Sequence, residues 1–314
     1  MKVRQSVFDT YWYFAAERQN IFFNRLNGRE PLTQDPIFQM YKFCNSYRAS
    51  DRVSQFLIRE VIYNKQYSEE DTLFRIFLFR LLNKSETWGL LEKELGEISL
   101  RTFSPDRYAR AIESIYARGE IVYGNAFILC ATKAFGFDKK HENHMALMKY
   151  VFRDTDFSQK LLHATSLQHL FETLRSLPLI GDFMAYQIAI DLNYSDVFNF
   201  DENDFTIAGP GAKRGIAKCF EDTNGKDSAY VIQWMVENQD KEFARLGINF
   251  QSLWGRKLHA IDCQGLFCET DKYSRVKFPE LKSNRVRMKT TFSRHSSQIS
   301  YFYPPKWGIN EKIG

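Results

Sequence analysis

The sequence predicts an all-α protein, and three features of its 314 residues support this fold class. Apolar residues recur with helical spacing along most of the chain, whereas the alternation that is typical of strands is weak. Glycine and proline number only 16 and 8, which favours helices with short connections over sheet sandwiches and barrels. Aromatic residues make up 16% of the chain, so a core of considerable size is expected.

Individual helices are predicted from apolar stripes and capping residues. Phe8, Trp12 and Ala16 repeat at helical spacing and form the apolar face of the first helix. Asp35 is expected to cap the next helix, because Pro36 fits its first position. Further helices are predicted over residues 53–63, 72–82, 104–117, 126–135 and 167–175.

The chain shows no targeting signal and no cofactor motif. No apolar run approaches the ~18 residues of a membrane span, and the N-terminus leads into no signal-peptide core. The five cysteines are scattered, which is typical of reduced thiols in the cytosol. The closest metal-like spacings, Cys263 with Cys268 and His141 with His144, lack a second pair of ligands nearby. We therefore expect a soluble cytoplasmic protein with no membrane partner, no metal and no other cofactor.

The positive charge is concentrated near the C-terminus. Residues 272–306 contain nine basic side chains and one acidic side chain, whereas the rest of the chain is slightly acidic. Such a segment on a nearly neutral body is typical of a site for a polyanion such as DNA. A solvated basic tail is the alternative interpretation.

A short hairpin between two helices is the most informative stretch. The first helix, over residues 167–175, should end before Pro178, because proline disfavours a helical residue in front of it. Gly181 then permits a tight turn, and a second helix follows at once. The first turn of that helix would present unpaired N–H groups beside a glycine, where a phosphate oxygen can approach. A plain structural hairpin is the alternative.

An acidic cluster and a Gly-Pro-Gly turn follow this hairpin. Asp201 lies twenty positions after Gly181, and Asp204 lies close to the turn that contains Gly209 and Gly211. Together with the Leu-Pro-x-x-Gly hairpin, this pattern resembles the helix-hairpin-helix DNA glycosylases. In that superfamily the hairpin grips a DNA phosphate, and the downstream aspartate faces the sugar of a flipped nucleotide. Phe183 stands where bifunctional members carry a Schiff-base lysine, so no lyase chemistry is expected.

Other stretches resemble one branch of that superfamily, which acts on hypermodified DNA bases. The branch includes alpha-glutamyl/putrescinyl-thymine pyrophosphorylases, phage amino-acid:DNA transferases, the helical domain of hydroxymethyluracil DNA kinases, and antiviral glycosylases that excise glucosylated hydroxymethylcytosine. The resemblance is carried by residues 11–19, 45–52, 204–215 and 268–273. It implies a two-lobed helix-hairpin-helix fold over residues 1–290, followed by a basic and aromatic tail over residues 291–314.

The predicted site residues fall into three groups. Asp204 is the favoured catalytic carboxylate, with Asp201 as the second candidate, and Glu202 is expected to be solvated. Asn45, Arg48 and Arg52 are spaced to share one helix face, which would line a base pocket; a surface ladder of ion pairs is the alternative. Gln187 and Asp191 are secondary pocket candidates. The residues predicted to hold the DNA backbone are Gly181, Gly209, Gly211, Lys213, Arg214, Lys272 and Arg275.

The resemblance implies a monofunctional DNA glycosylase that flips out and excises a hypermodified pyrimidine, leaving an abasic site, in defence against phages. One alternative is a transferase that places an amino acid or polyamine on pyrophosphorylated hydroxymethyluracil. A second alternative is a module that binds modified DNA without catalysis. Modified DNA is the partner in all three hypotheses.

Overall fold

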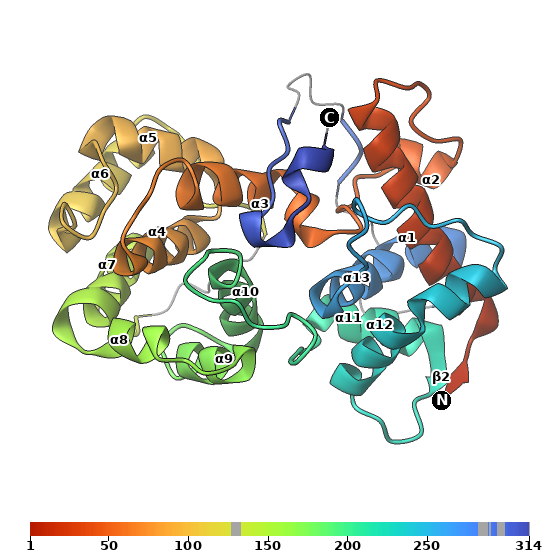
Figure 1. Cartoon of the computed structure of the whole chain (residues 1–314). Helices are drawn as coiled ribbons and strands as arrows, with labels where there is room; N and C mark the ends of the chain where they lie inside the picture. Colours follow the sequence, from red (N-terminus) through yellow and green to blue (C-terminus); the bar gives the residue numbers. More distant parts are fainter. Residues whose placement is uncertain (127–132, 282–287, 289, 294–298, 314) are drawn as a thin grey trace. The chain divides into compact units, whose positions relative to one another are not determined.

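The computed structural model describes residues 1–126, 133–281, 288, 290–293 and 299–313. Within these residues it contains thirteen α-helices and one sheet of two short strands, so the all-α prediction is confirmed (Figure 1). The strands β1 (Lys2–Val3) and β2 (Phe220–Asp222) pair in antiparallel fashion. None of the described helices is long and apolar enough to cross a membrane. The helix predicted over residues 126–135 falls mostly outside the described residues.

The chain divides into two compact units. Unit 1 contains Met1–Asp51, Glu202–Tyr301 and Trp307–Gly314, and unit 2 contains Arg52–Asp201 and Phe302–Lys306. The segment after residue 290 therefore contributes to both units. The predicted division of the chain at residue 290 stays a prediction.

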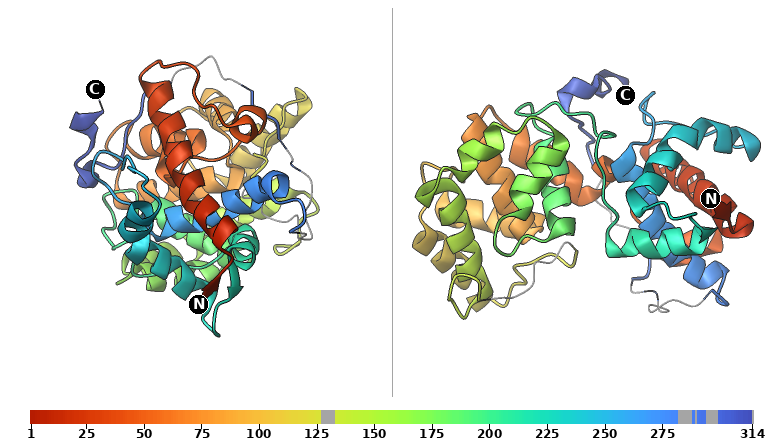
Figure 2. Two further views of the ribbon diagram at one scale, coloured as in Figure 1. Left: turned by 90° about the vertical axis from the view of Figure 1, so that its right-hand side faces the viewer. Right: turned by 90° about the horizontal axis from the view of Figure 1, so that it is seen from below.

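Unit 1 is built around α1, whose buried face is mostly aromatic. Its α-helices are α1 (Gln5–Leu26), α2 (Pro36–Met40), α11 (Pro210–Cys219), α12 (Ser228–Arg245) and α13 (Ala260–Lys277). It also holds the 3-10 turns η1 (Arg48–Ser50) and η5 (Asn310–Lys312). The predicted stripe of α1 is buried, and α1 packs across α13 (Figure 2). Phe8 and Trp12 make edge-to-face ring contacts with Phe220 and Phe243, so aromatic packing anchors α1.

Helices α11 and α13 approach each other closely because two positions on α11 lack side chains. A Cβ atom on Gly215 would lie 2.0 Å from the backbone oxygen of Phe267, and one on Gly211 would lie 2.3 Å from the Sγ atom of Cys268. Both contacts are far too short for a real methyl group. The Gly-Pro-Gly turn at the start of α11 therefore has a packing function within unit 1.

Unit 2 surrounds α4, every residue of which from Thr72 onward is buried. Its α-helices are α3 (Arg52–Phe56), α4 (Glu69–Leu82), α5 (Ser85–Leu95), α6 (Pro105–Ala117), α7 (Lys140–Lys149), α8 (Phe157–Leu162), α9 (Leu167–Arg175) and α10 (Asp182–Leu192). The π-helical turns η2 (Leu57–Ile62) and η3 (Tyr150–Asp154) continue α3 and α7. The 3-10 turn η4 (Pro305–Trp307) lies where the chain passes from unit 2 to unit 1. The helices predicted near residues 53–63, 72–82 and 104–117 are confirmed within one or a few residues.

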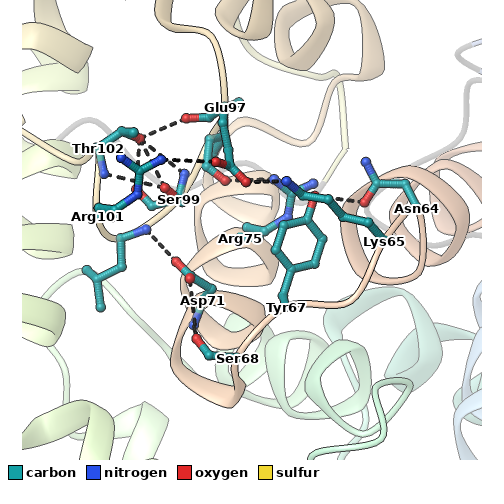
Figure 3. A network of polar contacts seen from close by, with 12 residues as sticks. Asn64, Lys65, Tyr67, Ser68, Asp71, Arg75, Glu97, Ser99, Arg101 and Thr102 are labelled. Carbon is teal, nitrogen blue, oxygen red and sulfur yellow. Dashed lines mark hydrogen bonds and ion pairs between the residues drawn. The ribbon is translucent and has the colours of Figure 1, made fainter.

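A buried arginine connects α4 with the π-helical turn η2 and with the loop that follows α5. The guanidinium of Arg75 donates to the backbone oxygens of Val61 (2.8 Å) and Ile98 (2.7 Å) and lies against the ring of Tyr67 (Figure 3). These contacts satisfy backbone acceptors that would otherwise be buried without a donor. Around it, Glu97 pairs with Lys65 at the surface (Figure 3).

Candidate functional site

The predicted hairpin is present in unit 2. Helix α9 ends at Arg175, as the sequence predicts, and α10 begins at Asp182 and packs against it. The turn differs from the prediction in one respect: Leu179, not Gly181, has the left-handed conformation, with φ of 70°. Gly181 has φ of −89° and is the N-cap of α10. A leucine therefore occupies a backbone conformation that favours glycine.

The start of α10 is open to solvent. Gly181 is exposed, and a Cβ atom placed on it would find no atom within 4 Å. The N–H groups of the first helical turn have no acceptor within the helix, and the helix dipole favours an anion there. The geometry is compatible with a phosphate contact at Gly181, which stays a prediction.

Gln187 and Asp191 lie deeper on α10, in the interior of unit 2. The carboxylate of Asp191 accepts a hydrogen bond from Nε of Arg80 on α4 at 2.5 Å, and both side chains are fully buried. Arg80 also donates to Asn83 at 2.7 Å. This ion pair gives Asp191 a structural role in joining α10 to α4, whereas its predicted contact with a base is not tested.

The two candidate catalytic aspartates belong to different units. Asp201 ends the central segment of unit 2, and Asp204 lies in unit 1; both side chains are exposed. The expectation that Glu202 is solvated is wrong. Glu202 is buried and forms an ion pair of 2.7 Å with Arg256, which compensates its charge away from water.

Asp262, which the sequence analysis did not select, is the carboxyl group at the centre of unit 1's polar interior. Its Oδ1 accepts the N–H of Arg48 at 2.8 Å and its Oδ2 accepts the N–H of His259 at 3.1 Å. Burial, together with the charge of Glu202, raises the pKa of Asp262 to about 7, against the opposing effect of these N–H groups and of Arg256. The only signal in the sequence was its spacing three residues after His259, which completes a capping box at the start of α13.

The expectation that Asn45, Arg48 and Arg52 share one helix face is wrong. Asn45 lies in a loop, where its side-chain amide donates to the backbone oxygen of Ser50 (2.8 Å) and to Asp51 (3.2 Å). Arg48 starts the 3-10 turn η1, and Arg52 begins α3 in unit 2. The amide of Asn45 closes the loop and so prevents a continuous helix.

Asp51 in this loop is a second carboxyl group with a shifted pKa. Burial raises its pKa to about 6, although the N–H of Asn45 and the charge of Arg18 act in the opposite direction. Asn45 and Arg48 therefore remain near titratable carboxyl groups of unit 1, while Arg52 belongs to the other unit.

Several residues predicted to hold DNA form internal ion pairs instead of presenting free charges. Asp271 is fully buried and pairs with Arg214 (3.1 Å), Lys218 (3.1 Å) and Arg275 (2.6 Å). Burial acts to raise the pKa of Asp271, but hydrogen bonds from Arg275 and Lys218 outweigh it and hold that pKa below its ordinary value. Lys272 pairs with Glu269 at 2.5 Å.

The remaining predicted contacts with the DNA backbone lie at the start of α11. Lys213 in the first turn of α11 is exposed, and Gly209 is the N-cap of that helix. Five further basic residues of the C-terminal segment, Lys282, Arg285, Arg287, Lys289 and Arg294, lie outside the described residues. Lys306, the last basic residue of this segment, donates to the backbone oxygens of Asn193 (2.6 Å) and Ser195 (2.9 Å) in unit 2.

Unit 1 also carries an open cavity of about 820 Å³ beside α1 and the loop that precedes α2. Its lining is rich in carboxylates, amides and hydroxyl groups, including Glu17, Asn24 and Asp35. Asp35 caps α2 and accepts hydrogen bonds from the hydroxyl groups of Tyr13 (2.9 Å) and Tyr273 (2.5 Å). None of the residues predicted as site residues lines this cavity, which suits a polar ligand by its composition.

Comparison with known proteins assigns the family. The model of the family described as "5-hmdU DNA kinase, helical domain" matches residues 5–283. The chain belongs to this family. The resemblance to the helical domain of hydroxymethyluracil DNA kinases is thereby confirmed, whereas membership of the helix-hairpin-helix glycosylase superfamily stays a prediction.

A curated relative of this helical-domain chain is the 5-hmdU DNA kinase of Bacillus phage SP10, which is 28% identical over 329 residues. The alignment covers 96% of this chain but 50% of the phage protein, so the chain spans about half the length of that relative. No solved structure matches the chain. The prediction of a DNA N-glycosylase is wrong, because the relative is named as a kinase, which is a transferase and not a hydrolase.

Proposed function

We propose that this chain binds DNA that contains 5-hydroxymethyluracil, or the phosphorylated form of that base, and takes part in a group transfer to it. The observation that carries the proposal is the match of residues 5–283 to the helical-domain family. The phage relative supports it, because its name gives 5-hmdU in DNA as the substrate of a transferase.

Two helix starts, one exposed at Gly181 and one at the buried Gly209 with the exposed Lys213 in its first turn, support contact with the DNA backbone. Helix α10 in unit 2 begins at Gly181 and α11 in unit 1 begins after Gly209, with Lys213 in its first turn. Helix N-termini bind phosphate through unpaired N–H groups and the helix dipole. In the proposed function each start binds one phosphate of the DNA.

In the proposed function, a buried carboxyl group of unit 1 takes part in the chemistry on the base. A group transfer requires the incoming nucleophile to lose a proton, and a carboxyl group with a pKa near neutrality can accept it. Asp262, with a pKa of about 7, has this property, and its oxygens are held in place by the N–H groups of Arg48 and His259. We propose that Asp262 is the general base that accepts this proton. Arg256 stabilises the negative charge of Glu202, which lies near Asp262.

The test measures binding to three DNA duplexes that differ at a single base: thymine, 5-hydroxymethyluracil and its phosphorylated form. We expect one of the two modified duplexes to bind the purified chain at least about tenfold more tightly than the thymine duplex in fluorescence anisotropy, a difference of about 1.4 kcal/mol. Equal affinity for all three duplexes would contradict the proposal.

Catalysis is tested separately from binding. Mass spectrometry of the nucleosides, after the modified duplex has been incubated with the chain and candidate amines or phosphoryl donors, should show a heavier nucleoside if transfer occurs. Asp262→Asn should lower that yield while keeping the preference for modified DNA. Preferential binding with no new nucleoside under any of these conditions would identify a binding module without catalysis, the second hypothesis for this chain.

A further inference from the structure

Helices α6 and α7 of unit 2 bring together three potential metal ligands that are distant in sequence. Glu113 lies on the last turns of α6, and His141 and Glu142 lie on the first turn of α7. One ligand atom from each residue lies within 4.8 Å of the others. The imidazole Nε2 of His141 is 3.5 Å from a carboxylate oxygen of Glu113.

The histidine provides an observation independent of the two carboxylates. His141 is only 4% exposed, and its Nε2 atom makes no well-aligned hydrogen bond among the described residues, although a carboxylate oxygen of Glu113 lies 3.5 Å away. A buried polar nitrogen without a partner costs free energy unless something else satisfies it. Because this nitrogen lies beside Glu113, a cation shared by the two groups would satisfy the nitrogen and compensate the carboxylate in place of Lys139.

We propose that Glu113, His141 and Glu142 bind a divalent transition-metal ion that joins α6 to α7. An imidazole with two carboxylates suits Zn²⁺, Mn²⁺ or Fe²⁺, whereas Mg²⁺ and Ca²⁺ prefer oxygen ligands alone. Ligand atoms around a tetrahedral ion lie about 3.3 Å apart, so the glutamates must move inward by roughly 1 Å. Both glutamates are partly exposed, and their side chains can make this movement.

Lys139 is the competitor for the same position. Its ammonium group forms an ion pair with Glu113 and lies 3.8 Å from a carboxylate oxygen of Glu142. A bound metal ion displaces this ammonium, so the site is weaker with Lys139 than without it. Removal of Lys139 should therefore tighten metal binding, and removal of His141 should weaken it. Nonspecific binding of metal to surface carboxylates would not depend on His141.

The test is calorimetric titration of Zn²⁺ and Mn²⁺ into the chain of 314 residues after removal of any affinity tag, with Mg²⁺ as a comparison ion. We expect one Zn²⁺ ion per chain, and an affinity reduced at least about tenfold by Glu113→Gln and by His141→Asn. Lys139→Ala should increase the affinity. His169→Ala and Lys149→Ala are matched controls, because His169 is an exposed histidine and Lys149 pairs with Asp154 at the other end of α7.

A second measurement guards against loss of folding in the variants. Zn²⁺ should raise the unfolding temperature of the wild-type chain and of both controls, because an ion that binds only the folded state stabilises it. Glu113→Gln changes a partly exposed carboxylate and should leave the unfolding temperature without metal nearly unchanged. Failure of the wild type to bind Zn²⁺ at submillimolar concentration, or equal binding by folded Glu113→Gln, would overturn the proposal.

Discussion

Asp262 shows how unit 1 changes the chemistry of a single residue. Its two oxygens accept backbone N–H groups from Arg48 and His259, yet burial still raises its pKa to about 7. The folded state therefore keeps a proton on Asp262 over a pH range in which the unfolded chain has already lost it. This contribution to stability is fully present below about pH 4 and is lost as the pH rises through about 7.

Asp262→Asn should flatten this pH dependence. Between about pH 4 and pH 7 we expect the wild-type free energy of unfolding to fall by up to about 1.4 kcal/mol per pH unit from this group, and the variant to lack that component. Asp51, whose pKa is raised to about 6, retains a smaller effect of the same sign. Urea unfolding at several pH values measures the slope. An unchanged slope in Asp262→Asn would show that Asp262 is already ionised in the folded state.

At the scale of elements, glycines have two different roles: some allow two helices to pack closely, and one leaves the start of a helix open to solvent. Gly211 and Gly215 allow α11 to contact α13, whereas Gly181 leaves the start of α10 uncovered. The sequence displays all three simply as glycines in turns or helices. Only the distances to neighbouring atoms separate a glycine needed for packing from one that leaves space for a ligand.

Gly215→Ala should destabilise unit 1 by about 3 kcal/mol, because its Cβ would overlap the backbone of Phe267 and neither backbone can yield easily. Gly265→Ala on α13 is the matched control. Its Cβ meets no atom within 4 Å, so this change should stabilise the helix by up to about 1 kcal/mol. Thermal unfolding compares the two variants, and equal stability would contradict the close approach of α11 to α13.

Gly181→Ala tests the hairpin as a phosphate contact. The backbone at Gly181 accommodates alanine, so we expect a stability loss of at most about 1 kcal/mol but a clear loss of DNA affinity, because the methyl group occupies the approach of the phosphate. Gly89→Ala on α5 also meets no neighbouring atom and should leave DNA affinity unchanged. Electrophoretic mobility shifts measure the affinity. If both variants bind DNA like the wild type, the hairpin is purely structural.

At the scale of the whole molecule, the charge available to DNA is smaller than the sequence suggests. Among the basic residues predicted to hold DNA, Arg214 and Arg275 pair, together with Lys218, with the buried Asp271, and Lys272 pairs with Glu269. Counting basic residues therefore overestimates the number of phosphate contacts.

Salt dependence measures this number directly. Lys213→Ala should weaken binding to modified and unmodified DNA by similar factors and reduce the slope of log affinity against log salt by about 1. Arg275→Ala should leave that slope unchanged but destabilise unit 1 by about 2 kcal/mol, because it removes one of the three cationic partners of a buried carboxylate. If the anisotropy titration showed a smaller salt slope for Arg275→Ala and an unchanged slope for Lys213→Ala, Arg275 and not Lys213 would be the residue that contacts phosphate.

The sequence by itself determined the all-α class, the capping of α2 by Asp35, the hairpin of α9 and α10, and the resemblance to the helical domain of hydroxymethyluracil DNA kinases. The helices, the cap and the hairpin depend on residues close together in the chain, so periodicity and capping residues predict them. The family resemblance depends on several motifs spread along the chain. The tertiary structure decided the rest: the burial of Glu202 with Arg256, the raised pKa of Asp262, the loop that separates Asn45 from Arg52, and the meeting of Glu113 with His141. Apart from the loop at Asn45, which closes through the nearby Ser50 and Asp51, each of these depends on segments distant in the chain that exclude water from one another. Burial of that kind leaves no periodic pattern in the sequence.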